Sequence, residues 1–579
     1  MLRRLALAPL LFAASASLLW AQGTAPTAPM RGACRQITAA CRAAGFVPGG
    51  GKTGNGLQAD CIAPILQGRP QRPKATRPLP QVDPEMVAAC KAENPSFGQG
   101  KEAAAGGSEA PPAPPLPPPG KARPGSPNIV LILTDDLSLN LVQYMPHVLK
   151  MQKDGVTFAN YFVTDSLCCP SRSSIFTGRF PHDTGVFKNT GADGGYRVFR
   201  DRGNGSATLA TALYGAGYHT AMLGKYLNGY EPRVDPPGPG WTSWHVAGNG
   251  YREFNYDLNE DGRITRHGSA SADYLTDVLS GLAAEFIRQS KGTPFVIEVA
   301  TFAPHAPYVP APRDADAFPG LRAPRGPAFD AAPGVDAPAW LRAVPPLSDA
   351  DKTRIDEAFR KRAQSVQAVD KMIGELQAAV AAIGAEKNTY FLFTSDNGYH
   401  MGEHRLRPGK MTAFDTDIHV PLIVTGPGVP AGRTVEEITE NVDLTPTFAK
   451  LAGAASPGTV DGLSLVPFLR GEAVKEWRAA ALVEHHGPDR ARNDPDMPAR
   501  HSGNPTTYEA IRGRTWVYVE YATGEKEYYD RATDPDELHN VYSSLSAEHK
   551  AALHAMLAAL ENCHDAAGCQ AAARPPARP

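Results

Sequence analysis

The sequence predicts an α/β protein with a mostly parallel central sheet flanked by helices, and a small antiparallel sheet plus a helix near the C-terminus. Apolar runs such as 128–134, 294–300 and 389–395 have no polar face, as is typical of strands buried in a parallel sheet. Helical patterns at 208–218, 272–290 and 355–384 alternate with these runs. Alternating residues at 507–530, followed by an amphipathic stretch at 546–563, indicate the antiparallel part.

Composition places the chain among ordinary globular proteins. Of 579 residues, 42% are hydrophobic and 20% are charged, which excludes a wholly disordered, coiled-coil or collagen-like chain. The 58 Lys and Arg residues nearly balance 60 Asp and Glu residues, so the net charge is −2. Because no overall positive field exists to hold a phosphate backbone, we expect no nucleic-acid partner.

The first 22 residues have the layout of a secretory signal peptide. Arg3 and Arg4 precede an apolar stretch, and small residues surround Ala21, after which we expect cleavage. The alternative is a membrane anchor, but the apolar run is short for a bilayer and Pro-rich polar sequence follows it. No later segment has about 18 uninterrupted apolar residues, so we expect a periplasmic or secreted protein with no membrane span after cleavage.

A small cysteine-rich helical module is predicted at 31–98, followed by a Pro-rich linker at 99–126. The module's four cysteines indicate two disulfides, with three connectivities open (Cys34, Cys41, Cys61 and Cys90). Cys563 and Cys569 are expected to form a local bridge. Zinc is the alternative for either group, but no Cys-x-x-Cys pair supports it. The segment GGGKT at 49–53 is interpreted as a glycine turn, because Gly45 is one residue out of register for a phosphate loop.

The remaining chain is divided into a catalytic α/β domain at 127–500 and an α+β subdomain at 501–570. Acidic pairs follow two of the predicted strands: Asp135 and Asp136 after the first, Asp396 and Asn397 after a later one. In such sheets chemistry gathers at the carboxyl ends of strands. Oxygen ligands favour Ca²⁺, with Mg²⁺ as the alternative, over zinc. Each pair taken alone could equally form helix caps or turns.

The most specific motif is Cys168-Cys169-Pro170-Ser171-Arg172 with a following Thr-Gly turn. Read with GKYLN at 224–228 and PHAP at 304–307, residues 127–560 resemble the sulfatase family of the alkaline-phosphatase-like superfamily. The motifs are most similar to those of N-acetylglucosamine-6-sulfatases and related arylsulfatases. The resemblance implies an alkaline-phosphatase-like fold and hydrolysis of a small-molecule or glycan sulfate ester.

The resemblance also implies roles for individual residues. Cys168 is expected to be oxidised to formylglycine by a formylglycine-generating enzyme, and to share the metal with the strand-end residues. Its hydrated aldehyde would be the nucleophile, whereas Cys169 is expected to be a small buried side chain. Arg172 would steady the nucleophile's oxygen, Lys225 and Lys410 would bind the sulfate, and His305 would protonate the leaving alcohol.

One position departs from the family pattern. Many members have Lys-x-His, where the histidine acts as a base, but Leu227 follows Lys225-Tyr226 here, with Asn228 next. The base is therefore unassigned, with three histidines as candidates (His182, His400 and His404).

Two further motifs and two rival functions stay open. YDLNEDGRI at 256–264 resembles half of a calcium-binding EF-hand loop but favours a hairpin turn, and His485-His486 either contacts substrate or caps a strand. The rivals to a glycan 6-O- or aryl sulfatase are a phosphonate or phosphate ester hydrolase of the same superfamily, and a non-catalytic glycan- or anion-binding protein with unconverted Cys168.

Overall fold

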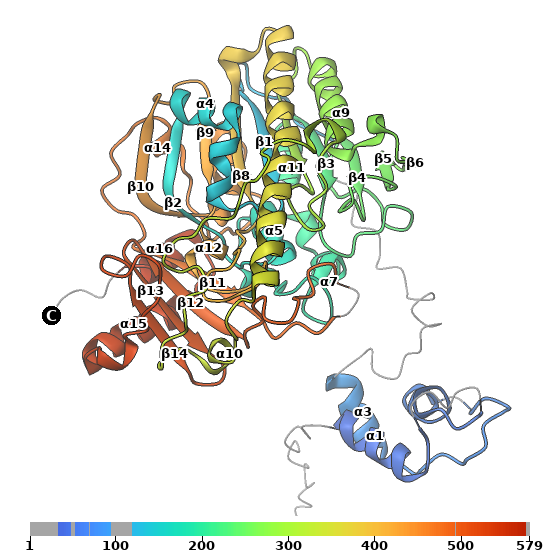
Figure 1. Cartoon of the computed structure of the whole chain (residues 1–579). Coiled ribbons are helices and arrows are strands. Elements are labelled where there is room, and N and C mark those ends of the chain that lie inside the picture. Colours follow the sequence, from blue (N-terminus) through green and yellow to red (C-terminus); the bar gives the residue numbers. More distant parts are fainter. Residues whose placement is uncertain (1–32, 48–52, 69, 94–117, 492–493, 575–579) are drawn as a thin grey trace, which may run out of the picture. The chain divides into compact units, whose positions relative to one another are not determined.

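The computed structural model describes residues 33–47, 53–68, 70–93, 118–491 and 494–574 (Figure 1). The chain divides into two compact units, 1–110 and 111–579. The predicted signal peptide, the glycines of GGGKT and most of the predicted linker lie outside the described residues.

The N-terminal unit is a small helical module closed by disulfides. Its elements are α1 (Ala33–Ala43), the π-helical turn Leu57–Ile62, α2 (Ala63–Gln67) and α3 (Pro84–Glu93). Cys34 pairs with Cys90 and Cys41 with Cys61, which confirms two bridges and selects one of the three connectivities. Ile37, Phe46 and Leu66 pack around these bridges. Since so short a segment buries little apolar surface, the bridges supply much of its stability.

The second unit contains a ten-stranded sheet in the order β10-β2-β9-β8-β1-β7-β3-β4-β5-β6. Its centre, β8-β1-β7-β3-β4, is parallel, as predicted, whereas β9 runs antiparallel to both neighbours and β5 and β6 form the expected hairpin. The strands are β1 (Asn128–Thr134), β2 (Val156–Phe162), β3 (His219–Lys225), β4 (Ser243–Ala247), β5 (Asp257–Glu260), β6 (Arg263–Arg266), β7 (Phe295–Ala300), β8 (Thr389–Ser395), β9 (Leu422–Thr425) and β10 (Arg433–Glu440).

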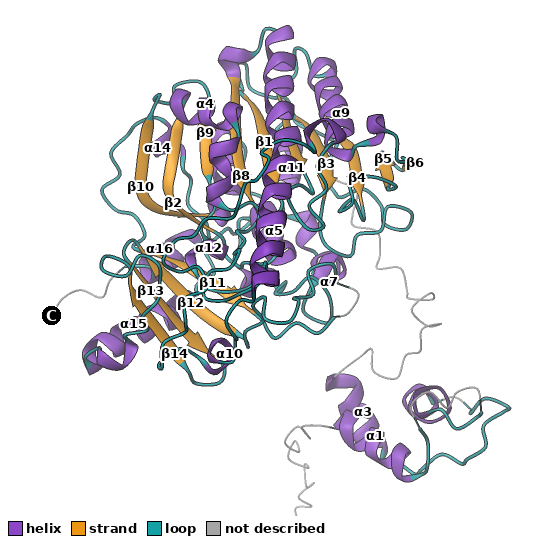
Figure 2. Ribbon diagram, viewed as in Figure 1, coloured by secondary structure: helices purple, strands orange, loops and turns teal. Residues whose placement is uncertain are grey.

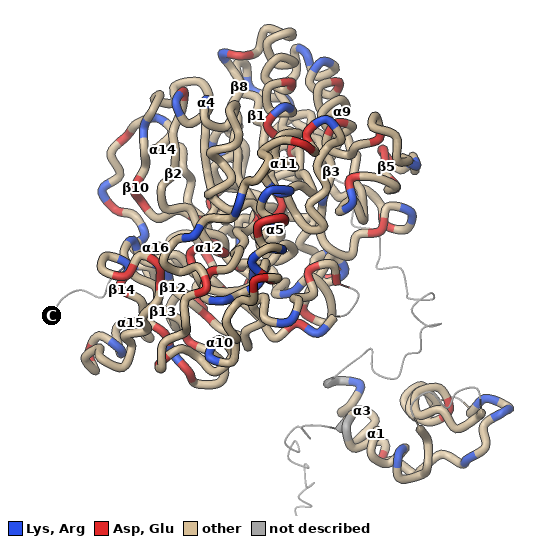
Figure 3. Tube along the Cα trace, viewed as in Figure 1, with Lys and Arg blue, Asp and Glu red and all other residues tan. Residues whose placement is uncertain are grey.

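Helices cover both faces of this sheet (Figure 2). Successive residues of β1 enter two separate cores: Leu131 and Leu133 pack in one, Val130 and Ile132 in the other. This explains why the strand sequence has no polar face, and why its segment carries no charged residue in Figure 3. The helices are α4 (Pro146–Asp154), α5 (Cys168–Thr177), α6 (Pro181–Thr184), α7 (Gly195–Asp201), α8 (Leu209–Gly215), α9 (Leu275–Gln289), α10 (Ala339–Arg342), α11 (Asp349–Ala382), α12 (Asp415–Ile418), α13 (Leu444–Ala452) and α14 (Val466–Leu469).

A four-stranded antiparallel sheet forms the C-terminal part, in the order β11-β12-β13-β14. Its strands are β11 (Ala480–His485), β12 (Tyr508–Gly513), β13 (Trp516–Tyr521) and β14 (Lys526–Asp530), followed by α15 (Ala547–Leu560) and α16 (Ala566–Ala572). The sheet thus includes β11, upstream of residue 501. The predicted local bridge between Cys563 and Cys569 is confirmed. Among the described residues, no helix is both long enough and apolar enough to cross a bilayer.

Candidate active site

The two strand-end pairs, Asp135-Asp136 and Asp396-Asn397, meet because their strands are parallel neighbours in register. Thr134 at the end of β1 lies opposite Ser395 at the end of β8, so the residues that follow emerge at one edge. The backbone N–H of Asp136 donates to Asp396 Oδ1 at 3.1 Å, and Asn397 Nδ2 donates to Asp136 Oδ1 at 2.7 Å. Asp135 and Asp136 come from the same strand end, and all four side chains are buried. The sheet register therefore builds a compact group of hard oxygen donors.

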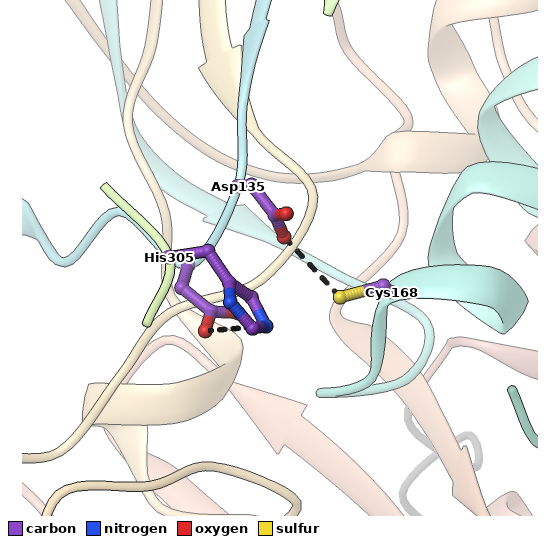
Figure 4. Close-up of side chains that lie close together, drawn as sticks. Asp135, Cys168 and His305 are labelled. Carbon is purple, nitrogen blue, oxygen red and sulfur yellow. Dashed lines mark hydrogen bonds and ion pairs between the residues drawn. The ribbon is translucent and has the colours of Figure 1, made fainter. Parts of the chain in front are cut away.

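Cys168 is the first residue of α5 and points its sulfur at this group (Figure 4). Its Sγ lies 3.3 Å from Asp135 Oδ1 and 2.8 Å from Lys410 Nζ. Burial, together with the nearby Asp135 and Asp396 carboxylates, raises the pKa of the thiol far above its ordinary value. The neutral thiol is a weaker nucleophile than a thiolate.

Three buried cations each bind a different carboxylate. Arg172 Nε lies 2.8 Å from Asp396 Oδ2, Lys225 Nζ lies 2.6 Å from Asp135 Oδ2, and Lys410 Nζ lies 2.6 Å from Asp136 Oδ1 (three ion pairs). Burial alone would lower the pKa of Lys225 and of Lys410, but these carboxylates raise both well above the usual value. The ammonium groups therefore remain charged beside the residue 168 side chain, where they can bind an anion.

His305 follows β7 and is the fourth cationic side chain of the site. Its Nδ1 lies 2.7 Å from the carbonyl oxygen of Ala306, and its Nε2 lies 2.6 Å from Asp496 Oδ1. Burial alone would lower the pKa of His305, but Asp136 and Asp496 raise it to about 9. The ring is therefore protonated near neutral pH, the state required of a proton donor.

The structure adds a residue that the sequence did not indicate. Asp496, in the loop between β11 and β12, places its carboxylate between His305 and Lys410, and its side chain is 1% exposed. Burial alone would raise the pKa of Asp496, but Lys410 and His305 lower it well below its usual range. The segment DPDMP at 494–498 has only the composition of a turn, so no local pattern could have identified it.

The donor set suits a hard divalent cation. Ligand atoms of four buried residues lie within 4.8 Å of one another (Asp135, Asp136, Cys168 and His305). Asn397 Oδ1 is buried beside them without a hydrogen-bond partner, as expected of an oxygen that needs a cation. Both ring nitrogens of His305 already have partners, so His305 itself is not needed as a ligand.

The three histidines considered as bases each have partners outside the group around Cys168. His182 Nδ1 lies 2.9 Å from Glu484 Oε2, and His400 Nδ1 lies 2.9 Å from Asp417 Oδ1. His404 stacks on Phe414 with ring centroids 3.8 Å apart, and burial lowers its pKa to about 3. Each has a structural role that explains its burial.

The adjacent histidines His485 and His486, singled out in the sequence, and Cys169 also have structural surroundings that account for them. His485 is buried and pairs with Asp165 at 3.0 Å, while His486 stacks on Phe187. Cys169 is buried in the apolar core on one face of the sheet and forms no disulfide. This agrees with the expectation that Cys169 is a small buried side chain.

Comparisons with known proteins agree with this geometry. The model of the family described as Sulfatase matches residues 127–454, more than half of the chain, and that of the N-sulphoglucosamine sulphohydrolase C-terminal region matches residues 402–563. Human N-acetylglucosamine-6-sulfatase is 34% identical over 474 residues, covering 76% of this chain and 85% of that protein.

Many solved structures share the fold, among them the following two. One is a protein in complex with its substrate D-glucosamine-2-N,6-O-disulfate, with a TM-score of 0.61 at 24% identity over 75% of this chain and 97% of that one. The other is the phosphonate monoester hydrolase of Agrobacterium radiobacter, with a TM-score of 0.55 at 26% identity over 73% and 93%. The family model and the human relative show that the chain belongs to the sulfatase family and is a sulfuric ester hydrolase.

Proposed function

We propose that this sulfatase is exported and removes the 6-O-sulfate of a glucosamine-containing glycan, after conversion of Cys168 to formylglycine. The overall reaction is R–O–SO₃⁻ + H₂O → R–OH + HSO₄⁻. The observation that carries the proposal is the position of Cys168, whose Sγ lies 3.3 Å from Asp135 and 2.8 Å from Lys410. A nucleophile installed there would face both the oxygen donors and the cations that an anionic ester requires.

The chain's own residues provide binding and proton transfer. Formylglycine, once formed, supplies a hydroxyl oxygen of its hydrated aldehyde as the nucleophile. Lys225 and Lys410 neutralise the sulfate oxygens, and Arg172 holds Asp396 in place through its 2.8 Å contact. Protonated His305 gives a proton to the alcohol oxygen as it leaves, which makes a good leaving group of a poor one.

The oxygen donors would hold a divalent cation, which we propose is Ca²⁺, with Mg²⁺ as the alternative. Its ligands would be the two strand-end pairs and the side chain at position 168 (Asp135, Asp136, Asp396, Asn397 and Cys168). When bound, the cation would supply positive charge that polarises the sulfate ester and draws electron density away from its sulfur. We propose a formylglycine-generating enzyme as a partner during maturation, and a periplasmic or secreted location, with which the three disulfides agree.

The test measures the conversion of Cys168, the dependence of turnover on the cation, and activity on the sugar sulfate. In protein produced with a formylglycine-generating enzyme, mass spectrometry of the peptide that contains residue 168 should show sulfur replaced by oxygen with loss of two hydrogens. Chelation should abolish turnover of N-acetylglucosamine-6-sulfate, and Ca²⁺ should restore it. An unmodified thiol in protein from the native source, with no turnover, would favour the anion-binding alternative.

The phosphonate monoester hydrolase likeness favours one second candidate, hydrolysis of phosphorus esters. Rates on N-acetylglucosamine-6-sulfate, 4-nitrophenyl sulfate and a phenylphosphonate ester separate the candidates. We expect the highest kcat/KM on the sugar sulfate. A clear preference for the phosphonate ester would replace the proposal with the second candidate.

A further inference from the structure

Four hydrogen-bond donors from separate parts of the chain converge on one carboxylate. Around Asp496, Lys410 Nζ lies 2.7 Å and His305 Nε2 lies 2.6 Å from Oδ1, while Asn189 Nδ2 lies 2.7 Å and Asn228 Nδ2 lies 3.2 Å from Oδ2. We call these four donors the oxyanion cradle. All four are buried, so each needs an acceptor, and two of them carry positive charge.

The oxyanion cradle lies against the residue where the chemistry is proposed. Asp496 Oδ2 is 3.7 Å from Cys168 Sγ, while Lys410 contacts both Asp496 and Cys168. An ester that reacts at position 168 must bring its sulfate oxygens into this space. A carboxylate and a sulfate both present anionic oxygens to charged and amide N–H donors, so the same donors can serve either group.

The sulfate and the Asp496 carboxylate cannot both use these donors. Two anions would lie in contact in a buried site, and the donors have few further N–H groups free to reach a second acceptor. We propose that Asp496 is an internal competitor: its carboxylate occupies the oxyanion cradle in the free protein, and the sulfate group of the substrate displaces it. Asn189 and Asn228 thereby become sulfate-binding residues alongside Lys410 and His305.

This arrangement has a clear physical benefit and a clear cost. In the free protein Asp496 accepts hydrogen bonds from four buried donors and gives Lys410 and His305 a nearby counter-charge. A ligand must compete with that carboxylate, so its apparent affinity is lower than for an open oxyanion cradle. An uncharged ligand offers no equivalent replacement, so the exchange selects for anions.

The inference rests on the proposed function for the identity of the ligand, but its test does not require turnover. The full chain is purified with Cys168 as the thiol, from a host without the converting enzyme. Titration calorimetry with sodium sulfate, in Ca²⁺-containing buffer of constant ionic strength, then measures oxyanion binding. We expect Asp496→Ala to bind sulfate at least ten-fold more tightly than the wild type.

Matched variants show whether the gain comes from the oxyanion cradle. Asp316→Asn, which neutralises an exposed carboxylate elsewhere, should leave the affinity for sulfate unchanged. Asn189→Ala or Asn228→Ala, each combined with Asp496→Ala, should remove most of the gain. If Asp496→Ala does not fold cooperatively, Asp496→Asn, which keeps the shape of the side chain, replaces it with the same expectation.

The converted enzyme supplies a second readout. For N-acetylglucosamine-6-sulfate, Asp496→Ala should lower KM. A fall in kcat is compatible with the inference, because the substitution also removes the contact of Asp496 with His305. Sulfate affinity that does not increase in the thiol form, including no measurable binding to either protein, overturns the inference. A raised KM also overturns it, because that result makes Asp496 a substrate contact. Failure of Cys168 conversion would defeat the proposed function but leave the calorimetry unaffected.

Discussion

Two buried charge clusters in the same unit are built differently. The active-site cluster comprises four carboxylates and four cations at the ends of the central strands (Asp135, Asp136, Asp396 and Asp496 with Arg172, Lys225, His305 and Lys410). The junction cluster comprises Arg478, Glu440 and Asp443, where β10 of the large sheet approaches β11 of the small one. Both consist of side chains that are at most 4% exposed.

The junction cluster is saturated. Arg478 binds Glu440 directly and lies 2.6 Å from Asp443 Oδ1. The backbone N–H groups of Leu482 and Leu463 donate to the same two carboxylates at 2.8 and 2.7 Å. No buried polar atom of these three side chains lacks a hydrogen-bond partner, so nothing in the cluster calls for a ligand.

The active-site cluster is not saturated. Asn397 Oδ1 and one terminal nitrogen of Arg172 are buried without hydrogen-bond partners. Burial of charge alone therefore does not mark a functional site. Groups left without partners, or with partners that can be exchanged, distinguish a cluster that binds and reacts from one that holds two sheets together.

The largest expected effect is a loss of catalytic activity with little change in the stability of the fold. Cys168→Ala should lower kcat on N-acetylglucosamine-6-sulfate by at least about ten-thousand-fold, since the nucleophile is removed. The thiol of the unconverted protein carries no ion pair, so the midpoint of urea unfolding of Cys168→Ala should stay close to that of the unconverted wild type. Retained turnover would remove Cys168 from the mechanism, and a large loss of stability would place it in the structural class instead.

The next expected effect is on stability and not on catalysis. Arg478→Met should lower the free energy of unfolding by about 3–5 kcal/mol, because two buried carboxylates lose their counter-charge. The kcat/KM of the folded fraction should not change. Denaturant unfolding measures the loss, and combining Arg478→Met with Glu440→Gln and Asp443→Asn should recover part of it. A specific effect on kcat/KM would mean that the two clusters are coupled.

The smallest expected effect is a pH dependence of the unfolding free energy, which we assign to the buried pair of His182 and Glu484. Burial alone would lower the pKa of His182, but its hydrogen bond to Glu484 raises it to about 9. The folded pKa exceeds the unfolded value of about 6.5, so the stabilisation is fully present below pH 6.5 and is lost as pH rises to 9. The difference in unfolding free energy between wild type and His182→Gln should therefore shrink over this window by about 1–3 kcal/mol.

Urea unfolding at several pH values between 6 and 9.5 measures that difference. Glu484→Gln provides the matched variant, because it removes the group that raises the pKa while keeping the histidine. It should weaken the same pH dependence. A difference that grows with pH would contradict the assigned charge state of His182.

Sequence patterns predicted much of the fold because they are local. The apolar runs that became β1, β7 and β8 need two buried faces, and this need is visible in consecutive residues. The sheet neighbours of β9 were not predictable in this way, since a short apolar run reads the same in either direction. The β11 strand was missed as part of the small sheet because its partner β12 lies beyond a long loop.

The strand-end carboxylates and the motif around Cys168 were predictable from the amino-acid sequence, because spacing along the chain places each on a strand end or a helix start. Which residues meet at the site depends on how the packed elements are arranged in space. Asp496 is 328 residues from Cys168 in the chain, yet their side chains lie 3.7 Å apart. The same holds for the pairing of Cys34 with Cys90 across 56 residues. Loops and disulfides carry no periodicity, so contacts of this kind arise only when the packed elements bring them together.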